Sequence, residues 1–140
     1  MCIRDRIIKE TPGHRVTIRT LDIGGDKTVA YLGQTHREAN PFLGWRSIRL
    51  SFEHPKFFMS QVRAVLRAGH YAAELGGELR IMFPMITTLE EMRRVRAMVR
   101  RAAKHLKEEG KEFAEIPIGM MLEVPAAAVS IDFMLSLIHI

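Results

Sequence analysis

Arg19 and the residues around it have the types expected of an anion site. Arg19 lies within an alternating apolar and polar run over residues 16–23, and Asp22 follows three positions later. A guanidinium group is planar and presents several N–H donors, so it suits phosphate or carboxylate. An ion pair between Arg19 and Asp22 is the structural alternative, and the residues alone leave both interpretations open.

Glu123 comes near the end of an apolar run that begins at Ile116 and has the length of a buried strand. A carboxylate in such a place needs a cation or hydrogen-bond donors, because burying an unpaired charge is costly. Mg2+ is suitable, since it binds carboxylate and substrate oxygens together and usually keeps some water. The spacing leaves two roles open for Glu123, a metal ligand and a partner of a basic side chain.

Arg46 lies in a loop over residues 41–49 that is rich in large apolar side chains, Trp45 among them, and that also holds Arg49. Such a loop must fold back onto the domain, because water solvates large apolar groups poorly. The functional interpretation is an arginine held over a binding site by aromatic packing. The structural interpretation is a surface arginine beside a buried tryptophan.

Other chemical motifs are incomplete. Residues 24–28 contain glycines and a lysine after a predicted strand but lack the Gly-Lys-Ser/Thr order of a P-loop, which argues against ATP binding by that route. The six histidines have no paired metal-ligand spacing. Cys2 is the single cysteine and cannot form an internal disulfide.

The elements that must position these residues alternate between strand and helix. Apolar periodicity, prolines at helix starts and two candidate capping pairs, Thr87 with Glu90 and Thr88 with Glu91, define them. In chain order they are a strand over 16–23, a helix from Pro55, a strand over 79–86 buried on both faces, a helix from Leu89 to a stop at Gly110, a strand over 116–124 and a helix from Pro125. This alternation predicts a parallel α/β sheet whose strand ends converge, and three strands can neither close a barrel nor form a fully covered sheet.

Composition and charge narrow the class of protein. With 47% hydrophobic and 26% charged residues, the 140-residue chain is typical of a globular domain. Much of the net charge of +5 falls in residues 93–107, where flanking glutamates indicate a solvated helix face, and no nucleic-acid motif accompanies it. No apolar run reaches the roughly 18 residues that would indicate a membrane span. We therefore expect a cytoplasmic protein with no nucleic-acid partner and no membrane insertion.

Four segments, in order and spacing, resemble Enzyme I of the bacterial sugar phosphotransferase system. They are VTIRTLDIGGDK at 16–27, NPFLGWR at 40–46, LRIMFPM at 79–85 and GMMLEVPAA at 119–127. The resemblance implies an incomplete (β/α)8 TIM-type barrel with about three parallel strands and their crossover helices. It also implies phosphoenolpyruvate as substrate, Mg2+ as cofactor, a homodimer, and phosphoryl transfer through an enzyme histidine to the carrier protein HPr for sugar transport.

The same resemblance assigns roles to three residues. Arg19 matches an arginine that binds the phosphate of phosphoenolpyruvate, Arg46 matches a second active-site arginine, and Glu123 matches one of two acidic Mg2+ ligands. Pyruvate phosphate dikinase and phosphoenolpyruvate synthase share related positions and form an alternative, although the first two segments favour Enzyme I. A non-catalytic dimerisation module is a further alternative.

Departures from the family pattern set the expected limits of the domain. The family has a preceding strand with another phosphate-binding arginine, and later strands with an Asn-Asp pair, an arginine and a cysteine proton donor, none of which is recognisable here. The expected division is a non-native leader over 1–7, a partial phosphoenolpyruvate-utilising barrel over 8–129 and a truncated tail over 130–140. Residues 134–140 are expected to be an apolar tail without a partner element. We expect the chain alone to be inactive and marginally folded.

Overall fold

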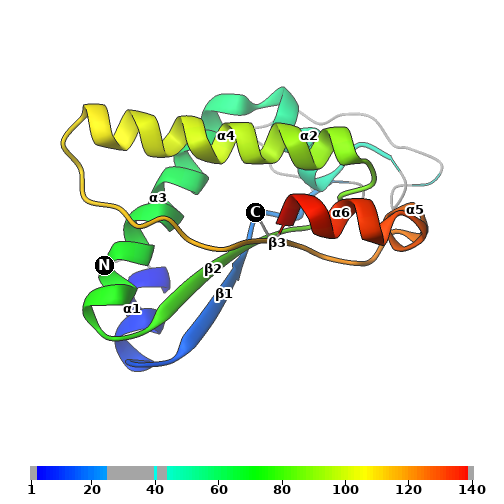
Figure 1. Ribbon diagram of the computed structural model, residues 1–140. Helices are drawn as coiled ribbons and strands as arrows, with labels where there is room; N and C mark the ends of the chain where they lie inside the picture. The colour runs from blue at the N-terminus through cyan, green and yellow to red at the C-terminus, as the bar shows by residue number, and fades with distance from the viewer. Residues whose placement is uncertain (1–2, 25–39, 41–43, 139–140) are drawn as a thin grey trace.

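Strands and helices alternate along the chain in a computed structural model that describes residues 3–24, 40 and 44–138 (Figure 1). Asp26, Lys27 and Cys2 lie outside the described residues. The elements are α1 (Ile3–Glu10), β1 (Arg15–Arg19), α2 (Ser47–Glu53), α3 (Pro55–Glu74), β2 (Glu78–Phe83), α4 (Leu89–Glu108), β3 (Ile118–Met120), α5 (Pro125–Val129) and α6 (Ile131–Ile138).

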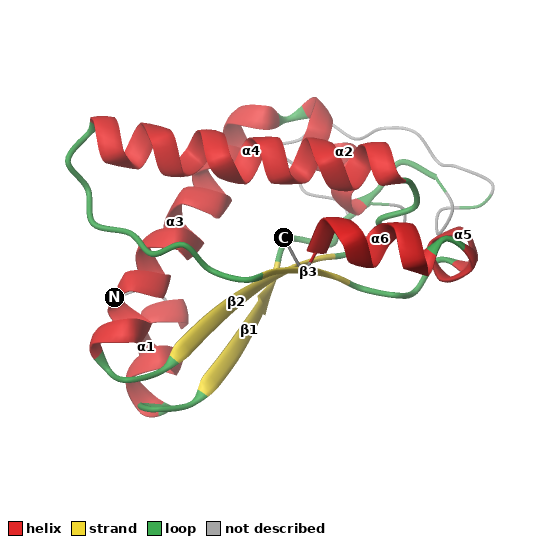
Figure 2. Ribbon diagram, in the orientation of Figure 1, coloured by secondary structure: helices red, strands yellow, loops and turns green. Residues whose placement is uncertain are grey.

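The three strands form one parallel sheet in the order β1-β2-β3 (Figure 2). Arg19 pairs with Met82, and Met82 pairs with Gly119, so the three strands point the same way and are in register. The sheet is open, as expected of part of an α/β barrel. The predicted fold class is therefore confirmed.

Each strand is shorter than the sequence pattern predicted. After Arg19 only the Thr20 N–H continues the ladder, and the Leu21 N–H turns to the side chain of Gln61, 3.2 Å away. β2 ends before Pro84, which has no N–H to donate, and Met85 then adopts a left-handed φ of 58°. The apolar runs therefore continue past the hydrogen-bonded strands into the loops that follow them.

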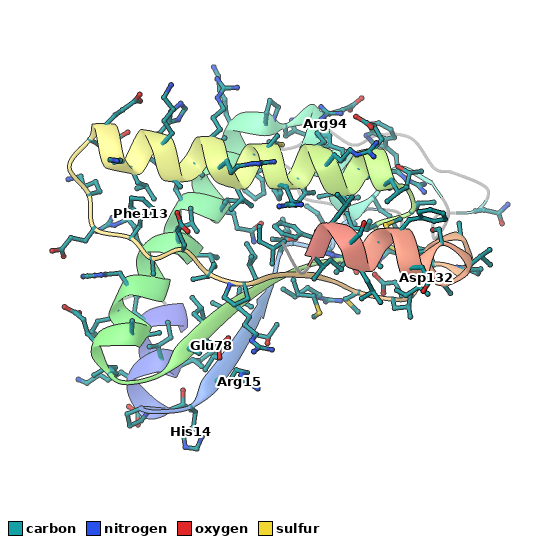
Figure 3. The ribbon with its side chains drawn as sticks, viewed as in Figure 1. His14, Arg15, Glu78, Arg94, Phe113 and Asp132 are labelled. Carbon is teal, nitrogen blue, oxygen red and sulfur yellow. The ribbon has the colours of Figure 1, made fainter. Side chains whose placement is uncertain are left out.

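Only one face of the sheet is covered among the described residues. Along β2, Leu79, Ile81 and Phe83 are buried, while the alternate residues are half-exposed, so the expected burial of this strand on both faces is wrong. At the amino end of the uncovered face, the Glu78 carboxylate accepts hydrogen bonds from Arg80 and Arg15, which lower its pKa. Figure 3 shows Arg15 and Glu78 together on β1 and β2.

Helices α3 and α4 cover the other face. Phe58 of α3 meets Phe83 of β2 edge to face, with ring centroids 5.9 Å apart, and α3 also packs against α4. The predicted capping box at the start of α4 is confirmed, because the Thr88 hydroxyl accepts the Glu91 N–H while the Glu91 carboxylate accepts the Thr88 N–H. The apolar stripe of α4 is buried at Met92, Val95, Val99, Ala102 and Leu106.

The terminal segments pack onto the domain. Ile8 of α1 is buried in the core, and α1 packs against α3. Met134 of α6 is fully buried, and α6 lies alongside α4 (Figure 1). The expectation of an apolar tail without a partner element is therefore wrong for residues 134–138, because a helix concentrates Met134, Leu137 and Ile138 against the core. None of the described helices combines the length and hydropathy needed to cross a bilayer.

Candidate functional site

The candidate site lies at the carboxyl ends of the three strands. A hydrogen bond of 2.9 Å from the Thr20 N–H to the Met82 carbonyl fixes the chain leaving β1. A second hydrogen bond, from the Met121 N–H to the Phe83 carbonyl at 2.9 Å, fixes the chain leaving β3. Arg19 and Glu123 therefore lie at the same end of the sheet, where a parallel α/β arrangement gathers its functional groups.

Asp22 lies between two arginines in the loop after β1. Its Oδ1 accepts hydrogen bonds from Arg46 Nη2 at 3.0 Å and Nε at 3.3 Å, and its Oδ2 accepts a second one from Nη2 at 3.1 Å. Arg19 Nη1 lies 3.6 Å from the same Oδ2. The structure thus brings together Arg19 and Arg46, which are far apart in sequence, across one carboxylate.

Arg46 is buried and Trp45 is partly exposed, which is the reverse of a surface arginine beside a buried tryptophan. Arg46 is 8% exposed, whereas Trp45 is 39% exposed and donates its indole N–H to the Glu53 carboxylate at 3.1 Å. A buried guanidinium requires a counter-ion with good geometry, and Asp22 provides it. The interpretation as a surface arginine beside a buried tryptophan is therefore wrong, and the fork with Asp22 is a contact that orients Arg46.

The backbone around Arg46 is held as tightly as its side chain. Arg46 forms an isolated antiparallel bridge with Gly24, and the Ser47 N–H donates to the Ile23 carbonyl at 2.8 Å. Ser47 has a left-handed φ of 55°, and its buried hydroxyl lies 3.4 Å from the Pro84 carbonyl. Strained residues of this kind persist only where their surroundings over-determine them.

Replacing Gly24 with alanine tests this close approach. Gly24 has a φ of 129°, and an added Cβ would lie 2.5 Å from the Arg46 Cβ and 2.6 Å from its Cα. We expect the free energy of unfolding, measured by urea denaturation of the 140-residue chain, to fall by about 1–3 kcal/mol. The control is Gly13→Ala, because Gly13 also has a positive φ, 73°, but nothing lies within 4 Å of its added Cβ. Equal losses in the two variants would contradict a specific role for the contact with Arg46.

Glu123 lies beyond the end of β3, exposed to solvent. Its Oε1 accepts the Met85 N–H at 2.7 Å, which connects the loop after β3 to the loop after β2. Arg19 reaches the same segment, with Nη1 3.8 Å from the Met121 sulfur. Within residues 44–138 and the described part of the N-terminal segment, no lysine or arginine forms an ion pair with Glu123.

The carboxylate oxygens at the carboxyl ends of the strands suit a cation that also binds oxygens of a bound substrate. The described residues include no cluster of three or more His, Cys, Asp or Glu side chains that could enclose a metal ion. Mg2+ is commonly held by one or two carboxylates together with substrate phosphate oxygens and water. Glu123 therefore fits a Mg2+ ligand if the remaining oxygens come from a bound substrate, whereas Asp22 has both oxygens engaged by guanidinium groups.

Part of the candidate site is exposed and part is buried, since Glu123 faces solvent whereas Arg46 is buried. A hollow of about 320 Å3 lies elsewhere, between α4, residues 115–118 and the end of α6, with Arg96 and Arg100 in its lining.

Sequence reasoning missed three features of this site: the central place of Asp22, the strained Ser47 and the strained Met85. The sequence indicates Asp22 only as a partner of Arg19, although Arg46 is its closer partner. A signal for this pair was present, since a loop arginine flanked by apolar residues needs a buried acid nearby. No sequence signal marks the backbone conformations of Ser47 and Met85, because both are ordinary residues that usually avoid positive φ.

The chain is similar to known proteins along most of its length. Residues 3–139 match the family described as PEP-utilising enzyme, PEP-binding domain. The chain is 47% identical over 127 residues to the phosphoenolpyruvate-protein phosphotransferase of Geobacillus stearothermophilus, covering 90% of this chain and 21% of that protein. It is 44% identical over 127 residues to the protein of the same name from Staphylococcus carnosus, with the same coverage. The Haemophilus influenzae protein of that name is 42% identical over 130 residues, covering 92% of this chain and 22% of the relative. The chain thus spans about a fifth of the length of these relatives.

Proposed function

Because the chain belongs to the family of PEP-utilising enzymes through their PEP-binding domain, we propose that it forms part of the phosphoenolpyruvate site of a protein phosphotransferase. The observation that carries the proposal is the pair of arginines, Arg19 and Arg46, joined by Asp22 at the carboxyl ends of the strands. Relatives that carry the name phosphoenolpyruvate-protein phosphotransferase support this activity over that of pyruvate phosphate dikinase or phosphoenolpyruvate synthase.

The proposed reaction moves a phosphoryl group from phosphoenolpyruvate to a histidine of the same enzyme and then to an HPr-type carrier. The bond between phosphorus and the enol oxygen breaks, a bond to the histidine nitrogen forms, and the enolate takes up a proton to give pyruvate. Such transfers depend mainly on positioning and on stabilising the charge of the nonbridging oxygens. In this scheme, Arg19 binds the phosphate and Arg46 acts as the second active-site arginine.

Glu123 is proposed as a ligand of Mg2+, together with oxygens of the substrate. A bound Mg2+ would neutralise negative charge on the phosphate and on the departing enolate. Glu123 itself contributes a carboxylate at the edge of the site, held by the Met85 N–H at 2.7 Å. This bond fixes one oxygen and orients the other.

A chimaeric enzyme tests the proposal, because this chain matches about a fifth of its relatives. Residues 3–139, which match the PEP-binding domain, would replace the corresponding segment of the Geobacillus stearothermophilus phosphotransferase. Pyruvate release would be followed in a coupled assay with phosphoenolpyruvate, Mg2+ and HPr. We expect the chimaera to turn over and the 140-residue chain alone to release no pyruvate. A folded chimaera without activity would refute the proposed function, and pyruvate release by the isolated chain would refute its expected inactivity.

The alternative of a non-catalytic dimerisation module makes a different prediction for the same chimaera. A module of this kind would preserve the association state in size-exclusion chromatography but would lose the response to phosphoenolpyruvate. Large apolar side chains near the carboxyl end of the chain favour some covering partner, since Leu122, Val129 and Phe133 are more than half exposed.

A further inference from the structure

We propose that Asp22 is a positioning residue that fixes the orientation of Arg46 and the spacing between Arg46 and Arg19. This inference rests on the proposed function, because it concerns how the two arginines meet a phosphorylated substrate. Asp22 would act through the arginines and would not touch the reacting atoms.

The geometry at Asp22 is that of a brace. Its side chain is 11% exposed, and both carboxylate oxygens accept N–H groups of Arg46. A guanidinium bound in this two-point manner is fixed in plane and direction as well as in distance. The side chain of Arg46 is 9% exposed, so few alternative positions are open to it.

Arg19 is held much less firmly than Arg46. Its side chain is 46% exposed, and its Nη1 lies 3.6 Å from Asp22 Oδ2 and 3.8 Å from the sulfur of Met121. These are longer contacts than the fork between Asp22 and Arg46. The site therefore combines one fixed guanidinium with one that can adjust, and Asp22 is the group common to both.

Asp22 also balances the charge of the pair. Two guanidinium groups near one point repel each other, and a carboxylate between them reduces that repulsion. The same carboxylate opposes the approach of an anion. A neutral residue at this position should therefore leave anion binding unchanged or tighter while it loosens the alignment needed for phosphoryl transfer.

The brace has a structural alternative, in which Asp22 only stabilises the fold. Loss of stability lowers the fraction of folded protein but leaves the turnover of each folded molecule unchanged. A loss of stability also does not tighten the binding of inorganic phosphate to the folded molecules. These two readouts separate a positioning role from a purely structural one.

The test uses Asp22→Asn in the chimaeric enzyme, with turnover normalised to the folded fraction. We expect kcat to fall about 10- to 100-fold, by analogy with the losses found when groups that orient metal-binding side chains are removed. Inhibition by inorganic phosphate should be unchanged or stronger. Asp132→Asn is the matched control, since it makes the same chemical change at an exposed position in the first turn of α6, and it should leave both quantities unchanged.

A double-mutant cycle with Arg46→Ala completes the test. If Asp22 acts through Arg46, adding Asp22→Asn to Arg46→Ala should lower kcat by much less than it does alone. Additive losses, a kcat within about threefold of wild type or weaker phosphate inhibition would overturn the proposal. If Asp22→Asn does not fold, Asp22→Glu keeps the charge but displaces the carboxylate by one methylene, and wild-type turnover in that variant would also overturn it.

Failure of this inference can be told apart from failure of the proposed function. If Asp22→Asn is fully active while Arg19→Ala and Arg46→Ala are inactive, the positioning role of Asp22 is refuted and the proposed phosphate site is retained. Full activity in the two arginine variants removes the phosphate site itself.

Discussion

Replacing Arg19 with alanine is expected to lower kcat/KM for phosphoenolpyruvate by on the order of 10³-fold in the chimaeric enzyme. An arginine that stabilises the charge of a transferring phosphoryl group contributes this much or more in comparable enzymes. Arg19 lies at the end of β1, and its side chain is nearly half exposed, so its removal leaves no buried cavity. Steady-state kinetics with a coupled pyruvate assay measure the loss, and thermal unfolding shows whether the fold is kept.

Arg15→Ala is the matched control for this variant. Arg15 lies four residues earlier on the same face of β1 and forms an ion pair with Glu78 at the amino end of the sheet. Arg15→Ala also removes one positive charge from β1, but at the amino end of the strand. Because salt screens charge effects over this distance, kcat/KM should stay within about twofold of wild type. Comparable losses in the two variants would mean that net charge, rather than a phosphate contact, explains the effect.

Replacing Glu123 with glutamine is expected to lower kcat by on the order of 10²- to 10³-fold, the range for loss of one electrostatic contact to the transition state. Glutamine has nearly the same shape, and its amide oxygen can still accept the Met85 N–H that now lies 2.7 Å from the carboxylate. The change therefore removes a negative charge and preserves the connection between the loops. Activity would be measured over a series of Mg2+ concentrations, and half-maximal activity should require more Mg2+.

The control for Glu123 is Glu115→Gln, which makes the same change in an exposed residue that precedes β3. Its Mg2+ dependence should match that of the wild type. If Glu123→Gln retains wild-type turnover at every Mg2+ concentration, Glu123 is not a metal ligand in this enzyme, although the arginine site would be unaffected by that result.

The sequence predicted those parts of the fold that depend on local patterns. The capping box of Thr88 and Glu91 and the proline starts of α3 and α5 come from side chains close together in sequence, and all are confirmed. The parallel direction of the strands followed from the alternation of strands and helices. Strand ends were less predictable, because an apolar run does not reveal where the hydrogen-bonded ladder stops, as residues 20–23 show.

The same limit applied to the candidate site. Placement of Arg19 and Glu123 at one end of the sheet followed from parallel topology, and the structure confirms that placement, while their chemical roles stay predictions. The pairing of Asp22 with Arg46 depends on a contact between residues 24 positions apart in different loops, which periodicity does not reveal. The packing of α6 was missed for a similar reason, since Met134 is buried by a helix distant in sequence.

The hydrogen bond between the Glu123 carboxylate and the Met85 N–H connects the proposed metal ligand to the backbone of the loop after β2. A cation at the second oxygen of Glu123 would share the carboxylate with this amide bond, so cation binding and the left-handed turn at Met85 would be linked, each changing the equilibrium of the other. A ligand event at one strand end would then be transmitted to the start of α4 through a single amide proton.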